Sequence, residues 1–147
     1  MADEIPVVVD TNVLFSALLR HGSPFATILL RAEHPFLVCE STLAELFRHK
    51  EKLVSLARIS EEEVVQLYHV LLRRVRVERE ELIPAAIRRE ALDLCREVDP
   101  ADAPQVALTL SVDGLLWTGD RRLRRGLEAR GFNRFFDPSW HLPGPNP

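Results

Sequence analysis

Ile5-Pro6-Val7-Val8-Val9-Asp10-Thr11-Asn12 is the stretch that decides the fold of this chain. Its short run of β-branched residues is typical of a strand that is buried on both faces of a parallel sheet. The run ends at Asp10, so a carboxylate stands where the buried strand stops. Burial of a charged carboxylate costs free energy, so a charge in such a place is expected mainly at functional sites.

Strand and helix patterns alternate over the rest of the chain. Further strands are predicted at residues 36–39, 75–78, 115–118 and 134–136. Helices are predicted at 13–19, from Pro24 behind a Ser23 cap, over about ten residues from a Ser41 cap, at 61–73 behind the Ser60 capping box, and at 84–98, 102–111 and 120–131. This order predicts one α/β domain with a mainly parallel, doubly wound sheet of about five strands. The domain takes in residues 1–141, and the proline-rich stretch 142–147 is expected to be a flexible tail.

Composition narrows the class of protein. The 147 residues are 46% hydrophobic with a net charge of -3, which suits a globular domain and gives no overall attraction to nucleic acid. The sequence contains no basic and apolar leader and no long apolar run, so neither export nor membrane insertion is expected. Cys39 and Cys95 are expected to be buried thiols, and a reducing cytoplasm fits them.

Four carboxylates, Asp10, Glu45, Asp102 and Asp120, lie beside predicted strand ends or on short helices. Parallel α/β sheets place their sites at the carboxyl ends of strands, so Asp10 and Asp120 are expected at one sheet edge. If the fold gathers all four, their oxygens would select Mg²⁺ or Mn²⁺. Each acid alone also has a structural explanation: the three aspartates as helix caps, Asp102 with Gln105, and Glu45 on a solvated helix face.

The acids stand in four ordered motifs, which are Val7-Val8-Val9-Asp10-Thr11-Asn12-Val13-Leu14, Ser41-Thr42-Leu43-Ala44-Glu45-Leu46, Asp99-Pro100-Ala101-Asp102-Ala103 and Leu116-Trp117-Thr118-Gly119-Asp120. In order and spacing, from about residue 5 to 140, they resemble the motifs of PIN-domain nucleases. The resemblance implies a three-layer α/β/α fold and a metal-dependent endoribonuclease that leaves 5′-phosphate and 3′-hydroxyl ends. It also implies the VapC-type toxin of a toxin-antitoxin pair, with RNA and an antitoxin as partners and a homodimer as its form.

By position in the motifs, Asp10, Glu45, Asp102 and Asp120 would bind the metal, with Asn12 and Thr118 as polar groups close to it. Asp99 would be an additional acid, but a turn before Pro100 explains it equally well. Many relatives carry an acid two residues after the one at position 120, where this chain has Arg122. One metal ion is therefore expected, and a second only weakly or with substrate. A bound ion would lower the pKa of a water aimed at phosphorus.

Basic and apolar side chains suggest how partners bind. Arg121, Arg122, Arg124 and Arg125 follow Asp120, and Arg48 follows Glu45; they could grip RNA phosphates or simply form solvated helix faces. Trp117 is expected in the core. An apolar stripe in the predicted helix at 61–73 suits the core, a dimer face or an antitoxin groove; its members are Val64, Leu67, Tyr68, Leu71 and Leu72.

Two other functions stay open. A catalytically silent PIN-like module that binds RNA or an antitoxin would explain Arg122. A phosphotransfer protein would also place an aspartate after its first strand, although Asn12 stands where a phosphatase has a second aspartate, and a receiver domain would need a lysine near Thr118. A dinucleotide-binding fold is excluded, because no Gly-x-Gly-x-x-Gly follows the first strand.

Overall fold

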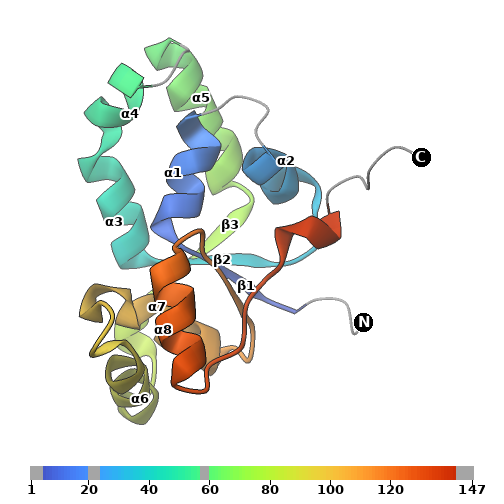
Figure 1. Cartoon of the computed structure of the whole chain (residues 1–147). Helices are drawn as coiled ribbons and strands as arrows, with labels where there is room; N and C mark the ends of the chain where they lie inside the picture. Colours follow the sequence, from blue (N-terminus) through green and yellow to red (C-terminus); the bar gives the residue numbers. More distant parts are fainter. Residues whose placement is uncertain (1–4, 20–23, 57–59, 142–147) are drawn as a thin grey trace.

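A four-stranded parallel sheet forms the centre of the molecule, in the order β3-β2-β1-β4 (Figure 1). The strands are β1 (Val7–Val9), β2 (Phe36–Cys39), β3 (Val75–Glu78) and β4 (Leu115–Trp117). The computed structural model describes residues 5–19, 24–56 and 60–141. The predicted Ser23 cap and the predicted tail at 142–147 lie outside these residues.

The predicted fifth strand at 134–136 is reduced to one parallel bridge. Leu116 of β4 pairs with Phe135, the Leu116 amide donates to the Arg134 carbonyl at 2.8 Å, and the Phe136 amide donates back to Leu116 at 2.9 Å. Asp137 and Pro138 follow at once and a 3-10 turn, η3 (Pro138–His141), begins. A proline has no amide to donate, so the ladder cannot continue. The expected count of about five strands is thus corrected to four.

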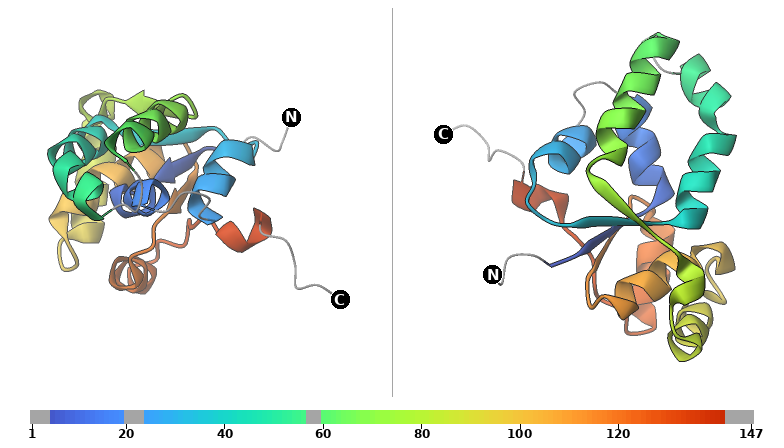
Figure 2. Two further views of the ribbon diagram at one scale, coloured as in Figure 1. Left: turned by 90° about the horizontal axis from the view of Figure 1, so that it is seen from above. Right: turned by 180° about the vertical axis from the view of Figure 1, so that it is seen from behind.

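Helices cover both faces of the sheet, as Figure 1 and the view from behind in Figure 2 show. One layer holds α1 (Thr11–Leu19), α2 (Pro24–Arg31), α3 (Glu40–Arg48), α4 (Lys50–Leu56) and α5 (Glu61–Leu72). The other layer holds α6 (Ala85–Cys95), α7 (Ala103–Ser111) and α8 (Arg121–Ala129), with the 3-10 turns η1 (Glu80–Leu82) and η2 (Pro100–Asp102). The predicted three-layer, doubly wound α/β architecture is confirmed.

Alternate strand residues enter two separate cores, because successive side chains of a strand point to opposite faces. Val7, Val9 and Trp117 pack with α1, α2 and α5. Val8 and Leu116 pack with α6, α7 and α8. Every residue of β1 is fully buried, which explains why its sequence is continuously apolar rather than alternating.

Of three helix caps predicted from local sequence, one is formed as predicted and two are not. The Ser60 hydroxyl accepts the Glu63 amide at 3.2 Å, as the capping box predicts. The predicted Ser41 cap is wrong: α3 already begins at Glu40, its N-cap residue is Cys39, and no side chain of its own sequence caps it. The predicted cap of α7 also differs from the observed one. The Asp102 carboxylate accepts a hydrogen bond from the Gln105 side chain at 2.8 Å and none from a backbone amide at the helix start.

Several side-chain predictions are confirmed. Cys39 and Cys95 are free and buried. Trp117 lies in the core with 1% of its surface exposed. The apolar stripe of α5 resolves to core, with Val64, Tyr68 and Leu71 buried and Leu67 and Leu72 packed against them. Within residues 5–19, 24–56 and 60–141, no helix has the length and apolar character needed to cross a bilayer.

Candidate functional site

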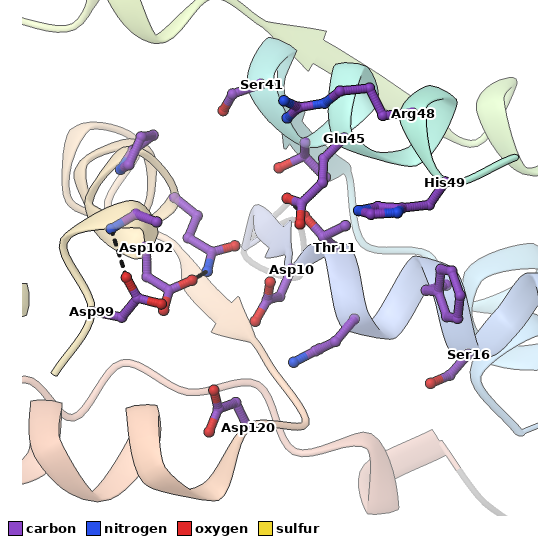
Figure 3. A pocket seen from close by; sticks show the side chains of 16 residues that line it. Asp10, Thr11, Ser16, Ser41, Glu45, Arg48, His49, Asp99, Asp102 and Asp120 are labelled. Carbon is purple, nitrogen blue, oxygen red and sulfur yellow. Dashed lines mark hydrogen bonds between the residues drawn. The ribbon is translucent and has the colours of Figure 1, made fainter. Parts of the chain in front are cut away.

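The strand order creates a crevice at the carboxyl edge of the sheet. The chain steps from β1 to β2 to β3 in one direction, and β4 then lies on the other side of β1. Such a reversal is where parallel α/β folds place their sites. A cavity of about 570 Å³ opens at this place (Figure 3). It is lined by Asp10, Thr11, Asn12, Phe15, Ser16, Ser41, Thr42, Glu45, Arg48, His49, Asp99, Ala101, Asp102, Pro104, Gln105 and Asp120.

Asp10 lies at the floor of this cavity with only 6% of its surface exposed. Its backbone still belongs to the sheet, because its amide donates to the Trp117 carbonyl at 3.0 Å. The Thr118 hydroxyl donates to Oδ2 of Asp10 at 2.6 Å. Burial raises the pKa of Asp10, and hydrogen bonds from Thr118, Gln105 and the backbone of Thr11 and Asn12 oppose the rise by stabilising the charged form.

Asp102 faces Asp10 from the start of α7. Burial, followed by the charges of Asp10, Asp99, Asp120 and Glu45, raises the pKa of Asp102 to about 7. All of the acids that the sequence selects therefore act on one carboxyl group. Each cause favours the neutral form, because an unscreened cluster of negative charges destabilises every member.

The remaining acids are Glu45 on α3, Asp120 at the start of α8, and Asp99, which caps the same 3-10 turn that ends in Asp102. Figure 3 shows Glu45 extending from α3 toward Thr11, whose hydroxyl donates to Oε2 of Glu45 at 3.1 Å. Asp120 accepts the amides of Arg122 and Leu123, so it caps α8 and lines the cavity at once. Asp99 accepts the Ala101 amide at 3.0 Å and also lines the cavity. Asp120 and Asp99 therefore each cap a helix or turn and also line the cavity.

Asn12 and Thr118 tie the ends of β1 and β4 together. Oδ1 of Asn12 accepts the Gly119 amide at 3.3 Å. The Thr118 oxygen, besides donating to Asp10, accepts the Asp120 amide at 3.1 Å. Thr118 does not line the cavity itself; it acts from behind Asp10. Both residues therefore lie beside the acids, as the motifs suggest.

The structure adds polar groups that the sequence did not single out. The sequence suggested Gln105 only as a partner in the cap of Asp102. In the structure its side chain is 5% exposed and donates a hydrogen bond to the Asp102 carboxylate. A glutamine in the otherwise apolar run Ala103 to Leu108 was the available signal, because a buried amide needs a partner. Thr11 and His49 also line the cavity. Neither has a local pattern that marks it, since their roles depend on how α1 and α3 pack.

The basic side chains divide into two groups. Arg48 lines the cavity beside His49 at the end of α3. None of the four predicted arginines of α8 is among the lining residues. Arg124 instead pairs with Glu128 at 2.9 Å, and its guanidinium lies 4.8 Å from the centre of the Phe135 ring.

The donor set fits a hard divalent cation in its chemistry. Carboxylate, hydroxyl and amide oxygens line the cavity, and these are the ligands that Mg²⁺ and Mn²⁺ prefer. The raised pKa of Asp102 marks a cluster that a cation would relieve. In the part of the chain that the structure describes, however, no three acidic, histidine or cysteine side chains stand close enough together to hold an ion. The acids share one cavity without yet forming a coordination sphere.

Comparison with known proteins agrees with this geometry. A chain of the crystal structure of VapBC2 from Rickettsia felis, bound to a DNA fragment from the promoter, superposes with a TM-score of 0.64 at 15% sequence identity, over 82% of this chain and 92% of that chain. PAE2754 from Pyrobaculum aerophilum superposes with a TM-score of 0.59 at 18% identity, over 86% of each chain. These likenesses show a shared fold. No curated protein sequence matches the chain. A family model described as PIN domain matches residues 8–139, and the chain therefore belongs to the PIN-domain family.

Proposed function

We propose that this protein is a divalent-metal-dependent endoribonuclease and the toxin of a type II toxin-antitoxin pair. PIN domains are generally nucleases. The observation that carries the proposal is that acids from separate segments line one cavity, where burial and then the charges of the neighbouring acids raise the pKa of Asp102 to about 7. A cluster with that much uncompensated charge is suited to cations and to the phosphates that accompany them.

Asp10, Glu45, Asp102 and Asp120 would hold Mg²⁺ or Mn²⁺, with Asp99 beside them. When bound, such an ion supplies an activated water at neutral pH and offsets charge on the phosphate. We expect one firm site, and a second only conditionally, because Arg122 stands where an acid would complete it.

The surrounding polar groups would hold the acids in productive orientations. Thr118 fixes one oxygen of Asp10, Gln105 fixes one of Asp102, and Thr11 fixes one of Glu45. Partners of this kind orient metal ligands and raise their affinity.

RNA would approach along the open side of the cavity. Arg48 is the best placed of the predicted phosphate-binding groups, because it lines the same cavity as the acids. Arg121, Arg122, Arg124 and Arg125 would contact the strand farther from the cleavage point. Phosphate contacts of this kind position the nucleic acid without reading its sequence.

An antitoxin, a homodimer and a cytoplasmic location complete the proposal. The VapBC2 structure contains a toxin-antitoxin complex, which supports a protein partner for a chain of this fold. A metal-dependent ribonuclease would meet its RNA in the cytoplasm.

Cleavage of RNA by the purified protein tests the proposal. With Mn²⁺ present, we expect cleavage of single-stranded or structured RNA, and loss of that cleavage in Asp10→Asn. Chelation of the metal should stop the wild type in the same way. An active Asp10→Asn protein, or a wild type that cleaves no RNA with Mn²⁺ or Mg²⁺, would rule out the nuclease assignment.

A catalytically silent module that binds RNA or an antitoxin is the second candidate. Arg122 in place of an acid favours it, and so does the lack of three converged ligand side chains among residues 5–19, 24–56 and 60–141. Calorimetric titration with Mn²⁺ separates the two functions. Binding of RNA without binding of metal would support the silent module.

A further inference from the structure

The helix that carries Glu45 receives its cap from a distant part of the chain. No side chain of its own sequence caps the first turn of α3. Instead, the Ser41 amide donates to Oε1 of Glu80 at 3.2 Å. Glu80 lies just beyond β3, at the start of η1. A negative charge at this place also suits the positive end of the helix dipole.

Strand pairing delivers Glu80 to this position. β2 and β3 run in parallel, with each residue of β2 opposite the residue 39 later, from Phe36 and Val75 to Cys39 and Glu78. Ser41 and Glu80 continue the same offset beyond the strand ends. The contact is therefore set by the register of the sheet and does not depend on a loose surface loop.

Glu80 is held between the two helices that face each other across the site. Its second oxygen, Oε2, is buried and has no hydrogen-bond partner among the residues that the structure describes. Glu80 also lines a small cavity of about 250 Å³ with Ala103 and Pro104 of α7. Pro104 lines the acidic cavity on its other side, next to Asp102. Glu80 thus lies between the starts of α3 and α7, which hold Glu45 and Asp102 opposite Asp10.

We propose that Glu80 is a positioning residue of the acidic site: by capping α3 from the end of β3, it fixes the distance of Glu45 from Asp10 and Asp102. The inference rests on the proposed function, since it takes Glu45 as a metal ligand. An ion binds most tightly where its ligands are already held close to their bound positions. A first turn released from Glu80 would hold Glu45 less firmly and would weaken the affinity for the ion.

Calorimetric titration of the full-length protein with Mn²⁺ alone tests this role, because it needs no RNA. For Glu80→Ala we expect a dissociation constant about tenfold higher, which is the usual loss when a partner behind a metal ligand is removed. Glu80→Gln keeps an oxygen that accepts the Ser41 amide, so it should bind Mn²⁺ close to the wild-type level. Glu81→Ala is the matched control, because Glu81 is exposed and its carboxylate pairs with Arg79 at 3.2 Å. Faster hydrogen exchange of the Ser41 amide in Glu80→Ala would report the lost cap directly.

A lower melting temperature with wild-type Mn²⁺ affinity in Glu80→Ala would overturn the inference, because the cap would then be only structural. A Glu80→Gln protein as weak as Glu80→Ala would overturn it too. Should Glu80→Ala fail to fold, Glu80→Asp gives the same test, since its carboxylate is too short to reach Ser41. If the wild type binds Mn²⁺ but cleaves no RNA, the nuclease proposal fails while the affinities still decide the role of Glu80.

Discussion

At the scale of single residues, the site depends on hydrogen bonds that favour the charged form of a buried acid. Asp10 is nearly enclosed, and burial alone would favour its neutral form. Four donors around it oppose that effect. One of them, the Thr118 hydroxyl, donates at 2.6 Å from a residue that does not line the cavity. A residue behind the acids therefore also influences the charge of the site.

Replacement of Thr118 by valine tests this dependence. Valine keeps the volume but removes the hydroxyl that donates to Asp10 and accepts the Asp120 amide. We expect Thr118→Val to lower kcat/KM for Mn²⁺-dependent RNA cleavage by about 10–100-fold. Thr118→Ser, which retains the hydroxyl, should stay near the wild type. Equal rates for the two variants would show that the hydroxyl is not needed.

At the scale of elements, the pairing of β4 with β1 places Thr118 beside Asp10. Asp113 adopts a φ of 52° in the tight turn before β4, and Gly114 follows it. A Cβ on Gly114 would stand 2.4 Å from the Pro6 carbonyl oxygen, and backbone cannot move aside as a side chain can. The Leu115 amide bonds that same carbonyl at 2.9 Å. Only glycine allows the two strands to start so close together.

Substitution of Gly114 by alanine should therefore destabilise the sheet. We expect a loss of about 1–3 kcal/mol in the free energy of unfolding, measured by urea denaturation monitored by circular dichroism. Gly119→Ala is the control, because among the described residues its Cβ would meet Oδ1 of Asn12 at 3.8 Å, an ordinary contact, and no atom closer than that. A Gly114→Ala protein as stable as Gly119→Ala would contradict the close approach.

Elements also show how far sequence reasoning reaches. The apolar run of β1 and the capping box of α5 are local patterns, and both are formed as predicted. The start of α3 is not predicted, because its cap comes from Glu80 through sheet register. The stretch at 134–136 has strand character but only bridges to β4, since Pro138 and the turn that it begins end the ladder. Local patterns determine elements, while tertiary contacts determine several of their ends.

The candidate site, too, could be predicted from the sequence only in part. Sequence order and motifs indicated which acids meet, and Asp10, Glu45, Asp99, Asp102 and Asp120 all line one cavity. Two things could not be read from the sequence. The contact of Gln105 with Asp102 depends on burial of one face of α7. The spacing of the acids depends on how α3, α7 and α8 pack, and in the part of the chain that the structure describes no three of them converge on one point.

At the scale of the whole molecule, the acidic cluster links stability to pH. The folded-state pKa of Asp102 is about 7, raised from 3.8. Folding therefore favours the protonated form of Asp102, and its contribution to stability is complete below pH 3.8 and is lost as pH rises toward 7. We expect the melting temperature of the metal-free protein to fall between about pH 5 and pH 7.

Thermal unfolding at a series of pH values, with and without Mn²⁺, checks this expectation. Asp102→Asn should flatten the dependence, because the titrating group is gone. Mn²⁺ should raise the melting temperature most at neutral pH, where more of the acids are charged than at low pH. At one hundred times the dissociation constant, the ion adds about 2.7 kcal/mol to the free energy of unfolding. A metal-free wild type whose melting temperature does not fall over this range would contradict the coupling among the acids.

The position of β4 in the chain affects how the protein is made. Of the four strands of the sheet, β4 is synthesised last, yet it pairs with β1, which is synthesised first. This pairing brings Thr118 and Asp120 to the sheet edge where Asp10 lies. A nascent chain that stops before residue 115 lacks β4, and with it the Thr118 hydroxyl that stabilises the charged form of Asp10. Fragments released by interrupted translation would therefore carry most of the acids without a working site. Any activity of this site would therefore require nearly the entire domain to have been synthesised.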